Sequence, residues 1–416
     1  MRGAAMARVV ATRDKMWDVV VVGSGPGGTA AAIGALNESP NASVLILDRS
    51  EFPRDKCCGD GVLLQAFDLL EDHGVDTKAL VGDYCPSSAI AIRSAEGGIT
   101  ASRDLPAQIV IIPRRVFDDR MRAAARAAGA EFRKQSVRWV RDVGTHVELD
   151  GGIQARAVIG ADGAESVVRR AILPPWTRRE IAVAIRGYEH SNDDDVPRVV
   201  LDKGHGLAYA WRFPITGGPA NIGYGCRLAP GESTDRRKLL ATLQRLMPTA
   251  APDPATLRAH RLPLSTSKHA VAAGRVLLVG DAASLINPVS GEGIYYAIRS
   301  GLNAGHATAH DPARAASQYR NALRRQFRVH HVHAAVMSQL IRSDAVLDAG
   351  LRAARDNQQA FDDLSMLCLG TGIITPSLAA RMSLKLVHAA DARDALGAYV
   401  RAGVGSLRGA IAGTNQ

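Results

Sequence analysis

The sequence of 416 residues predicts an α/β fold in three parts. These are a doubly wound, Rossmann-like dinucleotide-binding domain, an antiparallel-sheet substrate domain inserted into it, and a helical C-terminal region. Three observations carry this prediction. A glycine-rich turn joins an apolar run to an alanine-rich segment near the N-terminus. A middle segment alternates apolar and polar residues in strand fashion, and the pattern beyond about residue 331 is mostly helical.

The first strand, turn and helix are read from "WDVVVVGSGPGGTAAAIGALN". Four valines at 19–22 are typical of a strand buried on both faces of a parallel sheet. Gly23, Gly25 and Gly28 then follow the spacing G-x-G-x-x-G. In this pattern the glycines permit a tight turn, a close approach of the backbone to a pyrophosphate, and close packing of the next helix. The amides that begin this helix would face the phosphates.

The second strand, "SVLILD", ends in Asp48, twenty residues beyond Gly28. An acid at this distance can accept hydrogen bonds from a ribose hydroxyl. We include its neighbour Arg49 among the candidate cofactor-binding residues. A glycine fingerprint alone would be weak, but strand, glycines, helix, strand and acid occur here in the required order. The segment therefore predicts a dinucleotide site without identifying the dinucleotide.

Two later segments resemble the cofactor motifs of aromatic-hydroxylase-type flavoproteins. In "ARAVIGADGAESVVRR" a short strand ends at the turn Asp162-Gly163, and in "GRVLLVGDAASLINPVSGEGIYYAIRSG" a strand ends at Gly280-Asp281. The resemblance implies that Asp162 and its neighbours line the cofactor, and that Asp281 hydrogen-bonds the ribityl chain. It also implies that the loop 288–293 passes the isoalloxazine ring. The cofactor implied is FAD.

The helix after this loop is expected to begin at Gly291 or Glu292 and to direct its amides at the pyrimidine side of the ring. A helix N-terminus in that place would stabilise the negative charge that develops on the reduced ring. The candidate cofactor-binding residues of the two segments are Asp162, Gly163, Asp281, Pro288, Gly291, Gly293 and Ile294.

The segment "IIPRRVFDDRM" resembles the Arg-x-x-Phe/Leu-Asp segment of the same flavoproteins. Phe117 and Asp118 fit that pattern when the arginine is Arg114 rather than Arg115. The resemblance implies that Arg114 contacts the cofactor region. The alternative is a solvated helix start, which needs no ligand.

Several blocks together resemble the geranylgeranyl reductase family, whose members are FAD enzymes that reduce isoprenoid double bonds. The discriminating blocks are "FPRDKCCGDGV", "AYAWRFPITGGPANIGYG" and "FDDLSMLCLGTGIITP". The glycine and Gly-Asp blocks are shared with many flavin enzymes. The resemblance implies an FAD-binding domain at 1–82, 105–175 and 270–330, a substrate domain at 83–104 and 176–269, and a helical region at 331–416.

The adjacent cysteines Cys57 and Cys58 could be a metal clasp, a redox pair or part of a pocket wall. No second Cys/His pair stands at zinc spacing, so no metal site is predicted. A disulfide between neighbours would need a strained ring. Cys58 matches the family's cysteine, and Gly59 and Gly61 would permit close approach to the ring or the substrate. We therefore expect Cys58 and Gly59 at the cofactor, with Cys57 beside them.

The resemblance implies that flavin N5 delivers hydride to one alkene carbon while a proton reaches the other, in a dry cavity. Trp211, Phe213, Tyr188 and Tyr209 are candidates for the lining of that cavity, although each could be an ordinary core aromatic of the sheet. The candidate catalytic residues are Cys58, Tyr209 and Trp211. No residue must be the acid, and both Cys58 and water are candidates. The single dinucleotide fingerprint leaves NAD(P)H, or another electron donor, to bind transiently.

Two other functions compete with an isoprenoid reductase. A flavin monooxygenase or halogenase could use the same scaffold, because "AYAWRFPI" partly resembles the Trp-x-x-x-Ile-Pro segment of flavin halogenases, but this leaves "KCCGDG" unexplained. A flavin-carrying lipid-binding or electron-relay protein is the non-enzymatic alternative. Its sequence feature is the apolar recurrence from Leu396 to Leu407, which would form either a membrane-surface helix or a docked helix.

The composition narrows the partners further. The formal charge of +10 favours anionic partners, but sparse aromatic residues argue against nucleic acid. Five cysteines indicate a reducing compartment, and no apolar run reaches the length of a membrane span. We expect a cytoplasmic protein, with peripheral membrane contact as an alternative. His330 and His333 lie three apart on a predicted helix, where we interpret them as a polar helix face rather than metal ligands.

Overall fold

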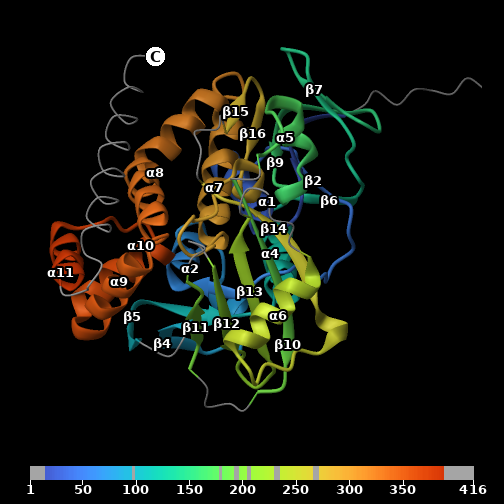
Figure 1. Ribbon diagram of the computed structural model, residues 1–416. Coiled ribbons are helices and arrows are strands. Elements are labelled where there is room, and N and C mark those ends of the chain that lie inside the picture. Colours follow the sequence, from blue (N-terminus) through green and yellow to red (C-terminus); the bar gives the residue numbers. More distant parts are fainter. Residues whose placement is uncertain are drawn as a thin grey trace, which may run out of the picture.

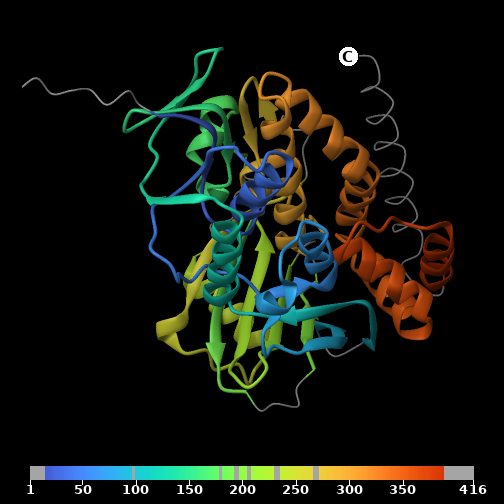
Figure 2. The ribbon, with the colours of Figure 1, turned by 180° about the vertical axis from the view of Figure 1, so that it is seen from behind.

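The computed structural model describes residues 15–95, 99–177, 180–191, 196–203, 208–228, 235–265 and 271–387. Two sheets organise this part of the chain, as Figures 1 and 2 show from opposite sides. The first sheet, with the helices that cover it, occupies the upper part of Figure 1, and the second sheet lies below it. The C-terminal helices pack against one side of both. The mixed α/β architecture confirms the predicted fold class.

The first sheet has the strand order β15-β16-β9-β1-β2-β6, and β7 and β8 form a hairpin beside β9. Its strands from β16 to β6 are parallel. The four predicted valines lie in β1 and are buried, as expected for a strand covered on both faces. The strands are β1 (Met16–Val22), β2 (Val44–Asp48), β6 (Glu131–Lys134), β7 (Val140–Asp142), β8 (Val147–Leu149), β9 (Ile153–Gly160), β15 (Ala272–Ala273) and β16 (Val276–Leu278).

The backbones of helices α1 (Pro26–Glu38) and α7 (Ile294–His310) lie in direct contact, because the residues where the helices cross include glycines. A Cβ at Gly305 would lie 2.0 Å from the carbonyl oxygen of Ala31, and one at Gly34 would lie 2.5 Å from that of Leu302. Neither helix could hold this position with a larger side chain there. Since α1 begins directly after the glycine-rich turn, this contact fixes the start of α7 relative to that turn.

The second sheet has the order β14-β10-β13-β12-β11-β4-β5-β3. All its pairings are antiparallel except that of β4 with β11, which is parallel. The sequence predicted an antiparallel sheet and did not predict this parallel pair. The chain leaves this sheet after β5, adds β6 to β9 to the first sheet, and re-enters at β10 on the other side of β4. It returns to the first sheet with β15 and β16 after β14. The strands are β3 (Gly61–Leu63), β4 (Pro86–Ser94), β5 (Thr100–Ile111), β10 (Ile181–Glu189), β11 (Arg198–Leu201), β12 (Ala208–Pro214), β13 (Ala220–Arg227) and β14 (Arg258–Pro263).

Two of these strands extend beyond the predicted substrate segments. The boundary predicted between residues 104 and 105 falls inside β5, and β3 lies within the predicted FAD-binding segment 1–82. The predicted boundaries at 82/83 and 104/105 therefore do not coincide with the points where the chain passes between the sheets, which lie before β3 and after β5. The division into domains itself stays a prediction.

The remaining helices cover the sheets and build the C-terminal region. Helices α9 and α10 are fixed to β5, because Arg103 donates to the carbonyl oxygen of Ala354 at 2.8 Å and Gln358 donates to that of Asp104 at 3.0 Å. The helices are α2 (Leu64–Glu71), α3 (Thr77–Val81), α4 (Arg114–Ala127), α5 (Val167–Ile172), α6 (Arg236–Leu246), α8 (Ala315–Leu340), α9 (Asp344–Asp356), α10 (Gln358–Leu369) and α11 (Pro376–Val387).

His330 of α8 does not lie on a polar helix face, as we had predicted, but is buried. One ring nitrogen lies 2.8 Å from the Tyr296 hydroxyl and the other 2.7 Å from the carbonyl oxygen of Gly372. It thus joins α8 to α7 and to the turn after α10. Within the described residues, no group of three or more His, Cys, Asp or Glu side chains could hold a metal ion.

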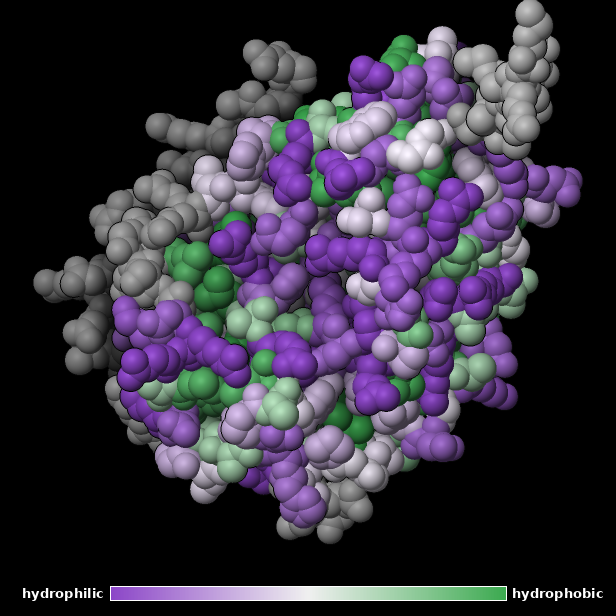
Figure 3. Space-filling model, turned by 90° about the vertical axis from the view of Figure 1, so that its right-hand side faces the viewer, coloured by the Kyte–Doolittle hydropathy of each residue, from purple (hydrophilic) through white to green (hydrophobic). Residues whose placement is uncertain are grey.

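The face in Figure 3 is mainly hydrophilic, and its hydrophobic side chains form small groups separated by polar ones. None of the helices in the described ranges combines the length and hydrophobicity of a bilayer-crossing segment. The apolar recurrence from Leu396 to Leu407, which we considered as a membrane-surface helix, lies outside the described residues.

Replacing Gly28 by alanine should displace α1 and weaken binding of the predicted dinucleotide. A Cβ at this position would lie 1.9 Å from the carbonyl oxygen of Gly23, which overpacks the turn at a cost of about 1–3 kcal/mol. Thermal unfolding and the ratio of flavin to protein absorbance measure both effects. Gly218→Ala is the control, since its added Cβ would meet nothing closer than 3.6 Å. Equal behaviour of the two variants would contradict the assigned role of Gly28.

Candidate active site

The glycine-rich turn is held in place by its neighbours in the first sheet. Gly23 has a φ of 102°, and a Cβ on it would lie 2.4 Å from the carbonyl oxygen of Ala161. Asp48 accepts from the amide of Ser24 and from that of Ser50, both at 2.8 Å. The acid at the end of β2 therefore orders the turn between β1 and α1. Its neighbour Arg49 has an exposed side chain.

The N-terminus of α1 faces two arginine side chains. Gly25 caps this helix, and a Cβ there would face guanidinium nitrogens of Arg54 at 3.6 Å and Arg114 at 3.8 Å. A separate cavity of about 230 Å³ lies beside Asp48 and is also lined by Ser24 and Phe52. A helix N-terminus with two arginines fits a pyrophosphate, and the cavity beside the acid gives space for a nucleoside. The residues present thus fit a dinucleotide such as FAD.

The carboxylate of Asp162 forms its hydrogen bonds within its own turn. It accepts from the Ser166 hydroxyl at 2.5 Å and from the Val167 amide at 2.7 Å, so it holds the start of α5. Gly163 follows with a φ of 75°. The resemblance placed Asp162 and its neighbours along the cofactor. In the structure this turn lies against the glycine-rich turn through Ala161, while the carboxylate itself is used within the chain.

The third cofactor segment surrounds the main cavity. Asp281 forms an ion pair with Lys56 at 3.0 Å. Burial alone would raise the pKa of Asp281, but Lys56 and other positive charges outweigh it, so this pKa lies below its ordinary value. Asn287 stabilises the following loop through two hydrogen bonds of 2.8 Å. Its side-chain oxygen accepts from the backbone amide of Val289, and its own backbone amide donates to the carbonyl oxygen of Glu292. α7 begins at Ile294.

The main cavity has a volume of about 350 Å³ and changes character along its length. The end beside the first sheet carries charged groups, namely Lys56, Arg114, Asp281 and Glu292. The second sheet contributes the aromatic side chains of Tyr209, Trp211 and Phe213, and α8 to α11 contribute mainly apolar ones. Of the predicted site residues, those that line this cavity are Cys58, Gly59, Arg114, Tyr209, Trp211, Asp281, Gly291, Gly293 and Ile294, whereas Pro288 is buried and is not part of the lining.

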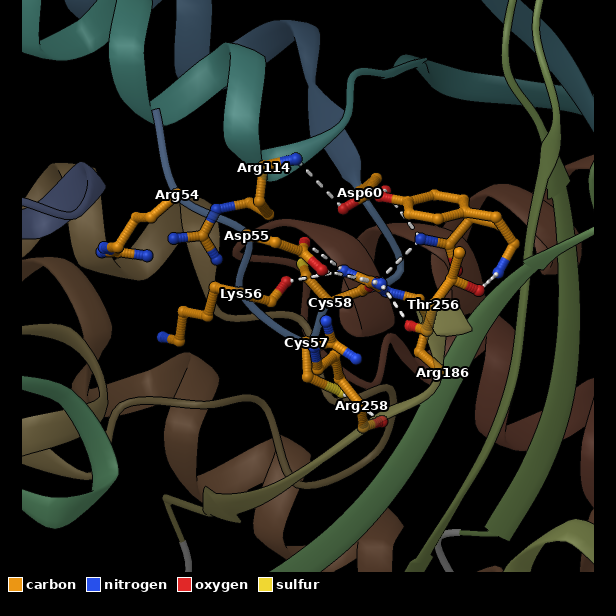
Figure 4. A network of polar contacts seen from close by, with 12 residues as sticks. Arg54, Asp55, Lys56, Cys57, Cys58, Asp60, Arg114, Arg186, Thr256 and Arg258 are labelled. Atoms are coloured by element: carbon orange, nitrogen blue, oxygen red, sulfur yellow. Dashed lines mark hydrogen bonds and ion pairs between the residues drawn. The ribbon is translucent and has the colours of Figure 1, made fainter. Parts of the chain in front are cut away.

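The loop Phe52–Val62, which contains both cysteines, bridges the two sheets, and Arg186 of β10 anchors it (Figure 4). Arg186 is fully buried and pairs with Asp55 at 2.6 Å. The same guanidinium donates to the carbonyl oxygens of Lys56 at 2.9 Å and Cys58 at 3.2 Å. One side chain thereby fixes three successive parts of the loop.

Asp60 is the second anchor and is completely buried, with a φ of 63°. It accepts from the Tyr188 hydroxyl at 2.6 Å and from the side-chain amide of Asn221 at 2.7 Å. Asn221 also donates to the carbonyl oxygen of Cys58 and accepts from the Trp211 indole, both at 2.8 Å. The predicted catalytic residues Cys58 and Trp211 are therefore joined through Asn221, which we did not predict.

The aromatic side chains divide into two groups. Trp211 and Phe213 pack against Gly59, where an added Cβ would lie 3.6 Å and 3.3 Å from their rings. Tyr209 donates its hydroxyl to the carbonyl oxygen of Ser290, so it covers the loop before α7. Tyr188, which we expected in the cavity lining, instead binds Asp60 and does not line the cavity.

Arg114 is buried, whereas its neighbour Arg115 is exposed, so the alternative of a solvated helix start is wrong for Arg114. Its guanidinium forms a bidentate pair with Asp118, at 2.6 and 2.8 Å. Asp118 also pairs with Arg54 at 3.4 Å. The loop is thus tied to α4 as well as to the second sheet.

The two cysteines are free thiols. Burial raises the pKa of Cys57 to about 12 and also raises the pKa of Cys58, so both stay protonated at neutral pH. Cys57 directs its sulfur at the carbonyl oxygen of Arg258, 3.4 Å away. This arrangement suits neither a nucleophilic thiolate nor a metal ligand.

Comparison with known proteins identifies the class of this site. The model of an FAD binding domain matches residues 16–197. A menaquinone reductase of Mycolicibacterium smegmatis is 32% identical over 324 residues, which cover 68% of this chain and 74% of that protein. A digeranylgeranylglycerophospholipid reductase of Methanopyrus kandleri is 30% identical over 313 residues, which cover 70% of this chain and 77% of that protein.

Solved structures share the fold. A geranylgeranyl bacteriochlorophyll reductase-like protein from Thermoplasma acidophilum has a TM-score of 0.74 at 23% identity, covering 90% of this chain and 97% of its own. The flavin-dependent brominase Bmp2 has a TM-score of 0.68 at 17% identity, covering 93% and 100%. At these identities the likeness shows the fold alone.

The cofactor cradle, the family model and the sequence relatives define an FAD-dependent oxidoreductase. FAD is its cofactor, as the resemblance implied. Within this class, the chain belongs to the geranylgeranyl reductase family. The evidence is its similarity to the sequence relatives, which extends over more than two thirds of its length.

Sequence reasoning missed Asp60, Arg186 and Asn221. Asp60 stands inside the quoted cysteine block, while Arg186 and Asn221 stand in "AIRGYEH" and "ANIGYG". A charged residue in the middle of an apolar strand pattern was the available signal for Arg186, because such a residue is rarely buried unless it is paired. Nothing local in the sequence showed that its partner would be Asp55.

The stability of the protein should depend on Asp60 in a defined pH range. Burial raises the pKa of Asp60 to about 6 from an ordinary value of 3.8, although Arg186, Tyr188 and Asn221 favour the ionised form. The folded state then binds this proton more tightly than the unfolded chain. The contribution of Asp60 to the free energy of unfolding therefore falls as pH rises from about 4 to about 6, by about 3 kcal/mol at most.

Asp60→Asn removes this titration while it keeps the side-chain size. The melting temperature of the wild type minus that of the variant should decrease from pH 4 to pH 6 and stay constant above. A difference that is the same at every pH would show that Asp60 is ionised throughout the range.

Proposed function

We propose that this enzyme reduces carbon–carbon double bonds in an isoprenoid chain of the geranylgeranyl type, or in a related hydrophobic metabolite. The observation that carries the proposal is the main cavity, which continues from charged groups at the FAD end into an apolar end. A small polar substrate would leave the apolar end unfilled. An extended hydrocarbon chain would bury it, at roughly 25 cal/mol for each Å² removed from water.

The apolar end is built by helices that the FAD-binding segment does not include. Ile341, Leu351, Phe361 and Leu364 line it from α8, α9 and α10 and their connections. Helices α9 and α10 are held against β5 by Arg103 and Gln358, so the cavity wall is fixed to the sheet. This arrangement supports a preformed site for a long, flexible substrate, because the cavity wall itself does not have to be ordered on binding.

The residues at the other end would hold the reacting part of the substrate beside the cofactor. Bound FAD supplies the two-electron hydride chemistry of this class. Arg54 and Arg114 would hold its phosphates or ring region, and Lys56 with Asp281 would hold its polar chain. Trp211 and Phe213 exclude water above Gly59, and Asn221 fixes the plane of the Trp211 ring.

The names of the relatives are consistent with this substrate class. One is called a menaquinone reductase and the other a digeranylgeranylglycerophospholipid reductase. We further propose that NAD(P)H or another reduced donor supplies electrons in a transient encounter, since the sequence has one dinucleotide fingerprint. A cytoplasmic location with peripheral membrane contact would give access to such hydrophobic substrates.

The proposal is tested by anaerobic incubation of the reduced holoenzyme with a panel of polyprenyl alcohols, diphosphates, phospholipids and quinones. Mass spectrometry should find a product with two added hydrogens for at least one substrate. No gain with any of them would refute the reductase function. A long-lived hydroperoxyflavin absorbance after mixing the reduced enzyme with oxygen would support a monooxygenase or halogenase instead.

Cys58→Ala should keep FAD but lower the rate of alkene reduction by about tenfold, which corresponds to about 1.4 kcal/mol of transition-state stabilisation. The thiol lines the cavity, while the backbone carbonyl that Arg186 and Asn221 bind remains in the variant. Cys57→Ala is the matched control. Cys57 also lines the cavity, but the variant should have a smaller effect because the Cys57 sulfur is directed at the carbonyl oxygen of Arg258. Equal, negligible effects on the measured turnover would assign both thiols to packing.

A further inference from the structure

Glu292 lines the main cavity, and none of the roles described above involves its side chain. It lies between Gly291 and Gly293, in the loop that precedes α7. Its carboxylate accepts from the amide of Tyr295 at 2.9 Å, and its own amide lies 3.2 Å from the Ser290 hydroxyl. These contacts fix the carboxyl group at the charged end of the cavity. In the described part of the chain, no cation forms an ion pair with it and no side chain hydrogen-bonds to it.

The other proton-bearing groups at this end are engaged or are poor proton donors at neutral pH. His260 also lines the cavity, but burial lowers its pKa to about 4, so its ring is neutral at pH 7. Asp281 is paired with Lys56, so it stays ionised. The Tyr209 hydroxyl donates to the carbonyl oxygen of Ser290, and burial raises the pKa of this tyrosine. Burial also raises the pKa of the Cys58 thiol, which makes it a weak acid. A proton source that recharges at neutral pH must therefore be another group.

The charged and titratable groups around Glu292 come from five segments of the chain. Arg114 of α4 favours its ionised form, and Asp281 favours its neutral form. Cys58, Tyr209 and Tyr296 also face it and interact with its charge. Burial is the largest effect and raises the pKa of Glu292 to about 7, although the amides of α7 oppose it. At neutral pH the group thus exchanges readily between acid and carboxylate.

We propose that Glu292 is the catalytic acid that donates the proton to the substrate alkene, an inference that rests on the reductase function proposed above. In the balanced reaction, one alkene carbon gains a hydride supplied by reduced FAD. The π electron pair forms a new C–H bond at the other carbon with the proton of Glu292. The O–H bond of the carboxylic acid breaks, and its electron pair stays on the carboxylate.

The carboxylate that remains is stabilised where it stands. The amide of Tyr295 donates to it, and the positive end of the 17-residue helix α7 lies beside it. Arg114 adds a positive charge nearby. Donation therefore does not leave an uncompensated charge in the cavity, and a proton taken from water restores the acid.

The test uses Glu292→Gln, which keeps the shape and cannot donate this proton, with Glu292→Asp as the conservative rescue. Glu131→Gln is the control, because that carboxyl is exposed on β6 and pairs with Lys15. Each holoenzyme is assayed for FAD content, for reduction of FAD by dithionite, and for product with two added hydrogens. Glu292→Gln should lower product formation by on the order of 10²–10⁴-fold with FAD content and reduction unchanged, and Glu292→Asp should recover part of the rate.

An independent readout is the infrared carbonyl band of a protonated carboxylic acid in the oxidised holoenzyme. One component of this band should be present below about pH 7 and disappear above it, be absent in Glu292→Gln, and persist in Glu131→Gln. The rate of the wild type should fall over the same pH range. A second component, from Asp60, should titrate near pH 6 in all variants.

Two failures are distinguishable. The proton-donor role is wrong, while the reductase function stands, if the wild type reduces a substrate and Glu292→Gln does so equally well. The same conclusion follows if no component of the carboxylic-acid band that titrates near pH 7 is lost in Glu292→Gln. If the wild type reduces none of the substrates, the reductase function is wrong and the donor role falls with it.

Discussion

The site depends on one buried contact, in which Arg186 of the second sheet binds the loop that leaves the first sheet. A guanidinium with no access to water must have its charge compensated, because removing one partner of such a pair typically costs several kcal/mol. Asp55 supplies the opposite charge, and two backbone carbonyls of the loop take further donors. The loop therefore has no alternative position of comparable energy while the second sheet is intact. Cys58, Gly59 and Lys56 owe their places at the cavity to this contact.

The consequence is that the FAD end and the substrate end are parts of a single polar framework. Asp60 and Asn221 continue it from the loop to Trp211, and Lys56 continues it to Asp281. A change in either sheet is transmitted to the loop between them. The glycine contact between α1 and α7 provides the corresponding constraint on the other wall, because it positions the loop that carries Glu292.

The cofactor half of the site could be predicted because its signals are local. The valines of β1, the three glycines and Asp48 lie within about thirty residues, and each has a requirement that its neighbours reveal. The network around Asp60 could not be predicted in this way. Its partners Tyr188 and Asn221 come from strands that are more than one hundred residues away, and only the pairing of β10 with β13 brings them together. The same limit explains why Tyr188 was assigned to the cavity and His330 to a polar face.

The parallel pairing of β4 with β11 has a consequence for how the chain folds. Ser94 meets Leu201 across more than one hundred intervening residues, and these residues include four of the eight strands of the first sheet, β6 to β9. Closing so long a segment before any contact is gained makes this pairing late and the contact order of the domain high. While the chain is being synthesised, the outer edge of β4 has no strand beside it until β11 emerges. Polar residues flank the short apolar run of β4, with Ser87 before it and Arg93 after it, and this reduces the tendency of the open edge to associate with other chains.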